Sequence, residues 1–566
     1  MTIYWPGTYA DASEDEGRTG ANPANEDTGL PFEVPDDVLR RHGARVLEPS
    51  TSAQSPVRAS DRTPEVGPAE RPTAYVSSVL LIPRDLLIER NADLDGLLAP
   101  VGMKLPTLTD RRDTLRRGEA AVPPEELASA VPVVLQPAER PVDIDAWTAL
   151  QALRANKDIG DRISLNHLMF ASGWVGDLGG VPGPIQGFMP PFGGAATSGY
   201  LDGPVSVELP AIDRSGTTTL GRPAVVAVLD TGIGENTWLG IPPLKTGLPV
   251  KDWKTGSYVE VDAEIQRAVK KAGRYVLEQG HPAEVIKHPK DEPLSRNPLV
   301  GTQAWCFGHG EFCAGIIAQI APKATVLAVR VMGTDGVATE GAVVAALKGL
   351  VKRIDGTSET PPRMVDVVSL SMGYLFERPK EEEATSPLAV QIHELRKRGV
   401  LVVAAAGNSA SSQRFFPASL STIEDRLTTP PVVSVGALNP NGSKALFTNE
   451  GPSVTCYATG TNVISTFPQD ANASRQPAVQ VAAVNRQDLP QFRQSPDVDD
   501  HTHSPFGVWT GTSFAAPHVA AHLANAVHGM APGTVTGKDE FDQAMKRARD
   551  AVTKVQEAAK PPDPAP

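Results

Sequence analysis

Four polar side chains in this chain of 566 residues stand where a parallel sheet would place chemically active groups. Asp230 ends a short apolar run just before a glycine turn, and Asn408 follows another apolar run. His309 lies between two glycines at a predicted helix start, and Ser513 opens a helix of small residues. Because parallel sheets place functional residues where strands end and helices begin, we expect these side chains to meet.

Each of the four residues also has an ordinary structural explanation when taken alone. An aspartate or asparagine after a strand often serves a turn, and a serine at a helix start often caps it. Together they supply a nucleophile, a base, a carboxylate that orients the base and an amide donor for an oxyanion. We therefore predict that Asp230 holds the Nδ1–H of His309, so that Nε2 accepts the proton of Ser513 during hydrolysis of a peptide bond.

The sequence around these residues resembles that of the subtilisin-like serine proteases, the subtilases. Six blocks occur in the family's order within residues 223–532, namely AVVAVLDTGIG, GHGEFCAGIIA, VVSLSMG, VVAAAGN, FFPAS and GTSFAAPHVAA. The chain order Asp, His, Ser is also that of subtilisin. The resemblance implies that Asp230, His309 and Ser513 are a catalytic triad, and that Asn408 and the backbone N–H of Ser513 form an oxyanion hole.

The same resemblance assigns substrate contacts to two backbone segments and one aromatic ring. It implies that one segment pairs with the substrate backbone beside the S1 pocket, and that the other forms the opposite wall. These segments are Ser371, Met372 and Gly373, and Ala405, Ala406 and Gly407. Phe415 falls near the family's pocket base, which implies a restricted S1 pocket.

Two insertions, at about residues 238–300 and 468–508, depart from the family pattern. We expect both to lie near the active-site face and to narrow substrate access. The second contains VDDHTH, which leaves open a metal site or a solvated polar loop, and the loop is favoured; its candidate ligands are Asp497, Asp499, Asp500, His501 and His503. We therefore predict no metal site and no required cofactor. Structural calcium stays an open alternative, although no motif indicates it.

The elements that must position these residues form an alternating pattern after residue 223. Five short, nearly continuous apolar runs predict strands at 223–229, 325–331, 365–371, 400–405 and 431–435. Helical patterns such as 339–353 and 388–398 separate them. Strands buried on both faces that alternate with helices predict a doubly wound, parallel-sheet α/β domain, over residues 223–535.

The chain before this domain divides into three predicted parts. Residues 1–72 are acidic and rich in proline, which predicts disorder. Residues 73–172 follow the order β-α-β-β-α-β of a small α+β, ferredoxin-like unit, and 173–222 form a Gly/Pro-rich linker. In position and element order, the second part resembles the family's propeptide, which implies an intramolecular inhibitor that is cleaved within the linker. After the α/β domain, residues 536–566 are predicted to form a charged helix and a Pro-rich tail.

Composition limits the partners of the chain. A formal net charge of −13 and a pI near 5.4 disfavour nucleic-acid binding. No apolar stretch approaches the length that spans a bilayer and no signal peptide is recognisable, so we expect no membrane contact and a cytoplasmic location. Three cysteines rule out a disulfide scaffold, and Cys313 is expected to be a small buried thiol. A protein or peptide substrate is the expected partner.

Two other classes of function remain open. The chain could be a catalytically silent binding scaffold with the subtilase fold. A nucleotide-binding protein is disfavoured, because Gly232 and Gly234 follow a strand but no third glycine stands at the required spacing. The enzyme hypothesis predicts that a serine-directed probe labels Ser513, whereas the other two predict no labelling.

Overall fold

The computed structural model of the chain describes residues 3–5, 34–47, 71–106, 129–139, 141–172, 203–215, 219–243, 258–273, 286, 288–291, 295–297, 302–357, 359–378, 380–423, 429–471, 479–480, 492–493, 501, 503–530 and 538–559. Most of the predicted linker and much of both insertions lie outside these residues. Within the described part of the chain, no helix has both the length and the apolar character needed to cross a membrane.

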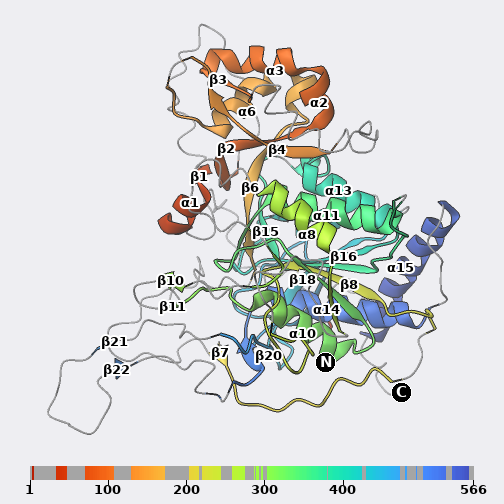
Figure 1. Cartoon of the computed structure of the whole chain (residues 1–566). Helices are drawn as coiled ribbons and strands as arrows, with labels where there is room; N and C mark the ends of the chain where they lie inside the picture. The colour runs from red at the N-terminus through yellow and green to blue at the C-terminus, as the bar shows by residue number, and fades with distance from the viewer. Residues whose placement is uncertain are drawn as a thin grey trace, which may run out of the picture.

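A seven-stranded parallel sheet forms the centre of the larger domain (Figure 1). The strand order is β19-β18-β16-β14-β8-β12-β9, and every neighbouring pair is parallel. The strands are β8 (Val225–Asp230), β9 (Val259–Val261), β12 (Thr325–Arg330), β14 (Val367–Leu370), β16 (Leu401–Ala405), β18 (Val432–Leu438) and β19 (Cys456–Thr459). The five predicted strands are thus present, and the two that the sequence did not reveal, β9 and β19, are short edge strands.

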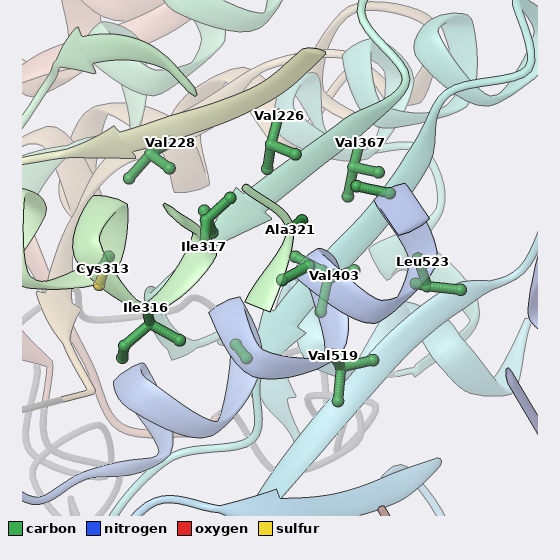
Figure 2. Close-up of a cluster of buried hydrophobic side chains, with 14 of the residues drawn as sticks. Val226, Val228, Cys313, Ile316, Ile317, Ala321, Val367, Val403, Val519 and Leu523 are labelled. Atoms are coloured by element: carbon green, nitrogen blue, oxygen red, sulfur yellow. The ribbon is translucent and has the colours of Figure 1, made fainter. Parts of the chain in front are cut away.

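Helices cover both faces of this sheet. One face carries α10 (His309–Ile320) and α14 (Thr512–His528), and the other carries α8 (Ala263–Ala272), α11 (Glu340–Asp355) and α13 (Pro387–Lys397). Along β8, Val226 and Val228 face the first layer, whereas Ala227 and Leu229 face the second. Figure 2 shows Val226 and Val228 beside residues of α10 and α14 in the first of these two cores. The doubly wound α/β architecture is confirmed.

The last helix, α15 (Lys538–Ala558), belongs to the packing of this domain. Its residues Ala548, Ala551 and Val552 are part of the same core as α14. The domain therefore continues beyond the boundary at residue 535 that the sequence suggested.

A smaller α+β domain precedes it in the chain, at the top of Figure 1. Its elements are β2 (Thr73–Pro83), α2 (Arg84–Glu89), α3 (Asn91–Leu98), η2 (Ala99–Val101), β3 (Met103–Lys104), β4 (Ala130–Val134), β5 (Gln136–Pro137), α6 (Ala146–Arg154), α7 (Lys157–Gly160) and β6 (Ser164–Ala171). Strand β2 pairs antiparallel with both β4 and β6, while β3 pairs only with β5. The helix α6 is capped by Asp145, which accepts the Thr148 N–H.

Two stretches within residues 1–72 are ordered, which corrects the prediction that this whole segment is disordered. Helix α1 (Asp36–His42) leads into β1 (Ala44–Leu47), which pairs antiparallel with β2. Near the start of the chain, Tyr4 exchanges two backbone hydrogen bonds of 2.8 Å with Tyr457 of β19. At the end of the segment, the Arg71 N–H donates to Glu377 O at 3.2 Å, and residues 6–33 and 48–70 lie outside the described part.

Short elements complete the fold. In the predicted linker, β7 (Gly203–Pro204) pairs with β23 (Phe506–Trp509), which also pairs with β20 (Val463–Thr466). The others are β10 (Ser295–Asn297), β11 (Thr302–Gln303), β13 (Val337–Thr339), β15 (Met372–Leu375), α12 (Lys380–Glu383), β17 (Phe415–Phe416), η4 (Ala418–Thr422), β21 (Val479–Gln480) and β22 (Phe492–Arg493).

Candidate active site

Asp230 and His309 meet at the carboxyl edge of the sheet. Asp230 is the last residue of β8, and His309 is the first residue of α10, just after Gly308 in the left-handed region (φ 83°). The Asp230 Oδ1 lies 2.7 Å from the His309 Nδ1, and both side chains are buried. Among the described residues, Nε2 of His309 has no hydrogen-bond partner. The pair therefore has the geometry of an imidazole oriented by a carboxylate, with its second nitrogen available.

An aromatic shell surrounds the His309 ring. Trp509 meets it edge to face at a centroid distance of 5.5 Å, and Phe514 lies at 5.1 Å. Phe312 packs against both of these rings. Phe514 directly follows Ser513, so this packing brings the start of α14 against the histidine.

Ser513 is buried at the start of α14 and is paired with Ser371. The Ser513 Oγ donates to the Ser371 carbonyl oxygen at 3.2 Å, and the Ser371 Oγ donates to the Ser513 carbonyl oxygen at 2.8 Å. The serine hydroxyl is thus turned toward the backbone that follows β14. A rotation about the Cα–Cβ bond of Ser513 would break its hydrogen bond to the Ser371 carbonyl and turn the hydroxyl toward a different acceptor.

Asn408 presents an unpaired amide donor next to Ser513. Its Oδ1 accepts hydrogen bonds from both the backbone N and the Oγ1 of Thr512, at 2.9 and 2.8 Å. Among the described residues, the buried Nδ2 has no partner. Since the oxygen is fixed by Thr512, the orientation of the amide is fixed too, and its N–H groups point away from the protein's own acceptors.

The predicted substrate segments border this site, but they contribute mainly backbone. Gly373 in β15 and Gly407 after β16 both lie against the Phe415 ring, because a Cβ on Gly373 would be 2.5 Å from Phe415 and one on Gly407 would be 3.3 Å away. Met372 and Ala405 turn their side chains into the two cores of the domain. Ala406 is buried in a separate small apolar cluster.

Strand β6 of the smaller domain lies between β13 and β15 of the larger domain (Figure 1). It pairs antiparallel with β15 on one side, with Ala171 opposite Met372, and with β13 on the other. The Ala171 N–H donates to Gly336 O at 2.8 Å, and the Ser172 N–H donates to Ser371 O at 2.9 Å. The Ser371 oxygen therefore accepts from both Ser172 and Ser513.

Asp291, which no sequence pattern singled out, is fully buried beside the site. Its Oδ2 accepts from Thr231 Oγ1 at 2.7 Å and from the Gly308 N–H at 2.8 Å. It thus links the residue after Asp230 to the residue before His309. Burial, reinforced by nearby Asp230, raises the pKa of Asp291 well above its ordinary value. A lone aspartate in a charged insertion carries no pattern that distinguishes it.

Glu311 is a second buried carboxyl group, in the first turn of α10. It accepts from the Gly234 N–H at 2.7 Å and from Asn236 Nδ2 at 2.8 Å, and so holds the loop after β8. Burial raises the pKa of Glu311 to about 8, although these hydrogen bonds lower it. The sequence signal that could have identified Glu311 is its position as an acidic residue within the mostly apolar block GHGEFCAGIIA.

Metal-ligating side chains gather only at the site itself within the described residues. The group found there is Asp230, His309 and Cys313. Burial raises the pKa of the Cys313 thiol, which lies 3.6 Å from the Ser513 carbonyl oxygen, so the thiol is a poor ligand and a weak nucleophile. Of the candidate ligands in the second insertion, Asp497, Asp499 and Asp500 lie outside the described part, and His501 Nδ1 is 3.0 Å from Ser206 Oγ.

Comparisons with known proteins agree with these features. A model of the subtilase family matches residues 221–554, more than half of the chain. Subtilisin BL of Lederbergia lenta is 31% identical over 176 residues, which are 30% of this chain and 56% of that protein. Thermitase of Thermoactinomyces vulgaris is 30% identical over 177 residues, which are 30% of this chain and 54% of that protein.

A fungal relative and a solved structure extend the comparison. Subtilisin-like protease 12 of Arthroderma benhamiae is 28% identical over 242 residues, 41% of this chain and 49% of that protein. The chain thus spans about half the length of the curated relatives it matches. The crystal structure of a cold adapted subtilisin-like serine proteinase covers 59% of this chain and 85% of its own, with 17% identity and a TM-score of 0.33, too low for further argument.

Proposed function

The chain belongs to the subtilase family, and we propose that it is a serine endopeptidase that works through Asp230, His309 and Ser513. The observation that carries the proposal is the 2.7 Å contact between Asp230 and His309 Nδ1, with Nε2 left without a partner among the described residues. An imidazole in this arrangement is held in the tautomer that accepts a proton at Nε2.

The proposed chemistry follows from these positions. The Ser513 hydroxyl turns from Ser371 to His309, transfers its proton to Nε2 and attacks the scissile carbonyl carbon. The Nδ2 of Asn408 and the backbone N–H of Ser513 stabilise the resulting oxyanion. Protonated His309 then gives its proton to the leaving amine, and water hydrolyses the acyl-enzyme in the reverse sequence of proton transfers.

We further propose that the smaller domain inhibits the enzyme by occupying its cleft. Strand β6 already forms the antiparallel pairing with β15 that a bound peptide would form. Because the Ser172 N–H and the Ser513 Oγ donate to the same oxygen, the peptide bond after Ser172 is the one presented to the nucleophile. Cleavage there would release the domain, so the proposed first product has Gly173 at its N-terminus.

A small residue before the scissile bond suits the proposed pocket. The Phe415 ring lies against both Gly373 and Gly407, and therefore limits the depth of the space between the two substrate segments. Serine occupies that position in the chain's own β6 segment. We propose a preference for small side chains there, in protein or peptide substrates.

The state of the cysteines indicates the redox character of the compartment that holds the protein. Cys313 and Cys456 are buried, and both are free thiols. Unpaired thiols are typical of reducing compartments, and we propose a cytoplasmic location on that ground. Fractionation of the source cells tests it, since recovery outside the cytoplasm would contradict it.

The test of the proposed function is fluorophosphonate labelling of the full chain and of Ser513→Ala, with intact masses and N-terminal sequencing of both. We expect labelling and a new N-terminus at Gly173 in the wild type only. Labelling of Ser513→Ala would contradict the assignment of the nucleophile. If the wild type remained unlabelled even after chymotrypsin cuts within residues 173–202, the silent-scaffold alternative would replace the proposal.

A further inference from the structure

A buried histidine of β6 lies between two carboxylates of the larger domain. His167 Nδ1 is 2.6 Å from Glu340 Oε2, and its Nε2 is 2.8 Å from Glu377 Oε2. All three side chains are fully buried. Both ring nitrogens are therefore bonded to carboxylate oxygens, which accept but cannot donate when ionised.

The two carboxylates come from opposite walls of the cleft. Strand β13 leads directly into α11, whose first residue is Glu340, and Glu377 follows the end of β15. Since β6 lies between β13 and β15, the two acids converge on one position of the strand that fills the cleft. His167 is five residues before Ser172, which is roughly 17 Å along an extended chain.

Aromatic rings complete the surroundings of His167. The Tyr374 ring stacks on the imidazole at a centroid distance of 4.4 Å and an interplanar angle of 18°. Phe376 lies at 5.7 Å in a tilted arrangement. An aromatic face beside two carboxylates favours a cation, because both the ring quadrupole and the negative charges attract it.

The charges at this position agree with a cationic occupant. Burial lowers the pKa of His167, but the attraction of Glu377 and Glu340 outweighs it and raises the pKa to about 9. Burial raises the pKa of Glu377, but His167 and Arg154 outweigh it and lower the pKa below its ordinary value. Arg154 of α6 also contacts Glu377, at 3.1 Å.

Departure of the smaller domain would remove both cations at once. His167 and Arg154 belong to that domain, whereas Glu340, Glu377 and Tyr374 stay with the cleft. The emptied position would then present two carboxylates beside an aromatic ring, and both features attract a cation.

We propose that Glu340, Glu377 and Tyr374 form a subsite that binds a cationic side chain on the sixth residue before the scissile bond. The count takes Ser172 as the first residue, and the inference rests on the proposed function. The enzyme would therefore favour protein segments with Lys, Arg or His at this position and a small residue at the cleavage point.

The first experiment measures occupancy of the subsite without hydrolysis. Hydrogen–deuterium exchange of β6 is compared in the full-length Ser513→Ala chain with His, Lys, Gln or Glu at position 167. We expect His167→Gln to exchange at least about tenfold faster than the parent and His167→Glu faster still, while His167→Lys stays closer to the parent. Unchanged exchange in β8 shows that each variant is folded. Exchange of His167→Gln or His167→Glu as slow as the parent overturns the proposal.

The second experiment measures selection during catalysis. The processed wild type is given peptides of residues 164–175 with Arg, Ala or Glu in place of His167. We expect kcat/KM to fall in that order, by roughly tenfold for each step. Glu340→Gln should bring the Arg-to-Ala ratio toward one. The matched control Glu394→Gln should keep it, because the half-buried Glu394 of α13 pairs with Lys397 and Arg398 and has no contact with His167 among those the structure gives. Equal kcat/KM for the three peptides overturns the subsite. If no peptide is cleaved, the proposed function fails, and the exchange experiment still decides whether the subsite prefers a cation.

Discussion

His309 and His167 are both buried and both contact carboxylates, yet the two arrangements differ in which ring nitrogens they leave without a partner. His309 bonds one carboxylate through Nδ1, and its Nε2 has no partner among the described residues. His167 bonds a carboxylate through each nitrogen. One imidazole can therefore accept a proton from a neighbour, whereas the other retains its own protons to satisfy both acids.

The two contacts also differ in whether they join residues of one domain or of two. The carboxylate beside His309 comes from the same domain and stays with it whatever occupies the cleft. The carboxylates beside His167 belong to a different domain from the histidine, so this contact exists only while β6 lies in the cleft. Of these two contacts, only that of His309 leaves a nitrogen available for the proposed chemistry.

The largest expected effect comes from removing each histidine in turn. His309→Ala should lower kcat on the order of 10⁶-fold, because the nucleophile loses its base. His167→Ala should act in the opposite direction and speed fluorophosphonate labelling of the full chain, because β6 leaves the cleft more easily. Labelling rates of the two variants, with melting curves as the folding control, measure both effects. Slower labelling of His167→Ala would end the distinction drawn between the two histidines.

A smaller effect is expected at Asn408, whose Nδ2 is left unpaired within the described structure. Asn408→Ala should lower kcat by about 10²–10³-fold with little change in KM, because the donor acts on charge that develops in the transition state. Asn441→Ala, in an exposed turn, is the matched control and should retain the parent kcat. A loss expressed in KM alone would contradict the oxyanion-hole role.

Replacing Phe415 should change which side chain is preferred at the position of Ser172. Phe415→Ala should deepen the pocket and raise kcat/KM for peptides with Phe in place of Ser172 by about tenfold or more. Peptides that keep Ser at this position should change little. The ratio of the two kcat/KM values is the measurement, and an unaltered ratio would place the ring outside the pocket.

The smallest expected effect is a pH dependence of the contact between the domains. The pKa of His167 is raised to about 9, so its contribution is fully present below the ordinary histidine pKa near 6.5 and is lost as the pH rises through about 9. The Ser513→Ala chain, cut by chymotrypsin within residues 173–202, should retain the smaller domain on size exclusion at pH 7 and release more of it at pH 10. His167→Gln should lack this step. The same pH step in His167→Gln would assign it to another group.

The places of Asp230, His309, Asn408 and Ser513 in the fold could be predicted because each one is tied to a local pattern. Asp230 and Asn408 follow continuous apolar runs, and such runs become adjacent parallel strands with a common carboxyl edge. His309 and Ser513 begin helices whose small residues allow close packing on that sheet. The larger departures, such as the ordered α1 and β1 and the docked α15, depend on contacts with distant elements.

The sequence by itself therefore determined the parallel sheet, the order of its strands along the chain and the identity of the four residues at its edge, because strand and helix periodicity and motif spacing are local properties. Only the tertiary structure decided that Asp291 links the two halves of the Asp230–His309 pair, that β6 pairs with both β13 and β15, and that Glu340 and Glu377 enclose His167. These contacts join residues from 17 to 210 positions apart. A buried charge depends on which opposite charge the fold brings to it, and no local pattern specifies that partner.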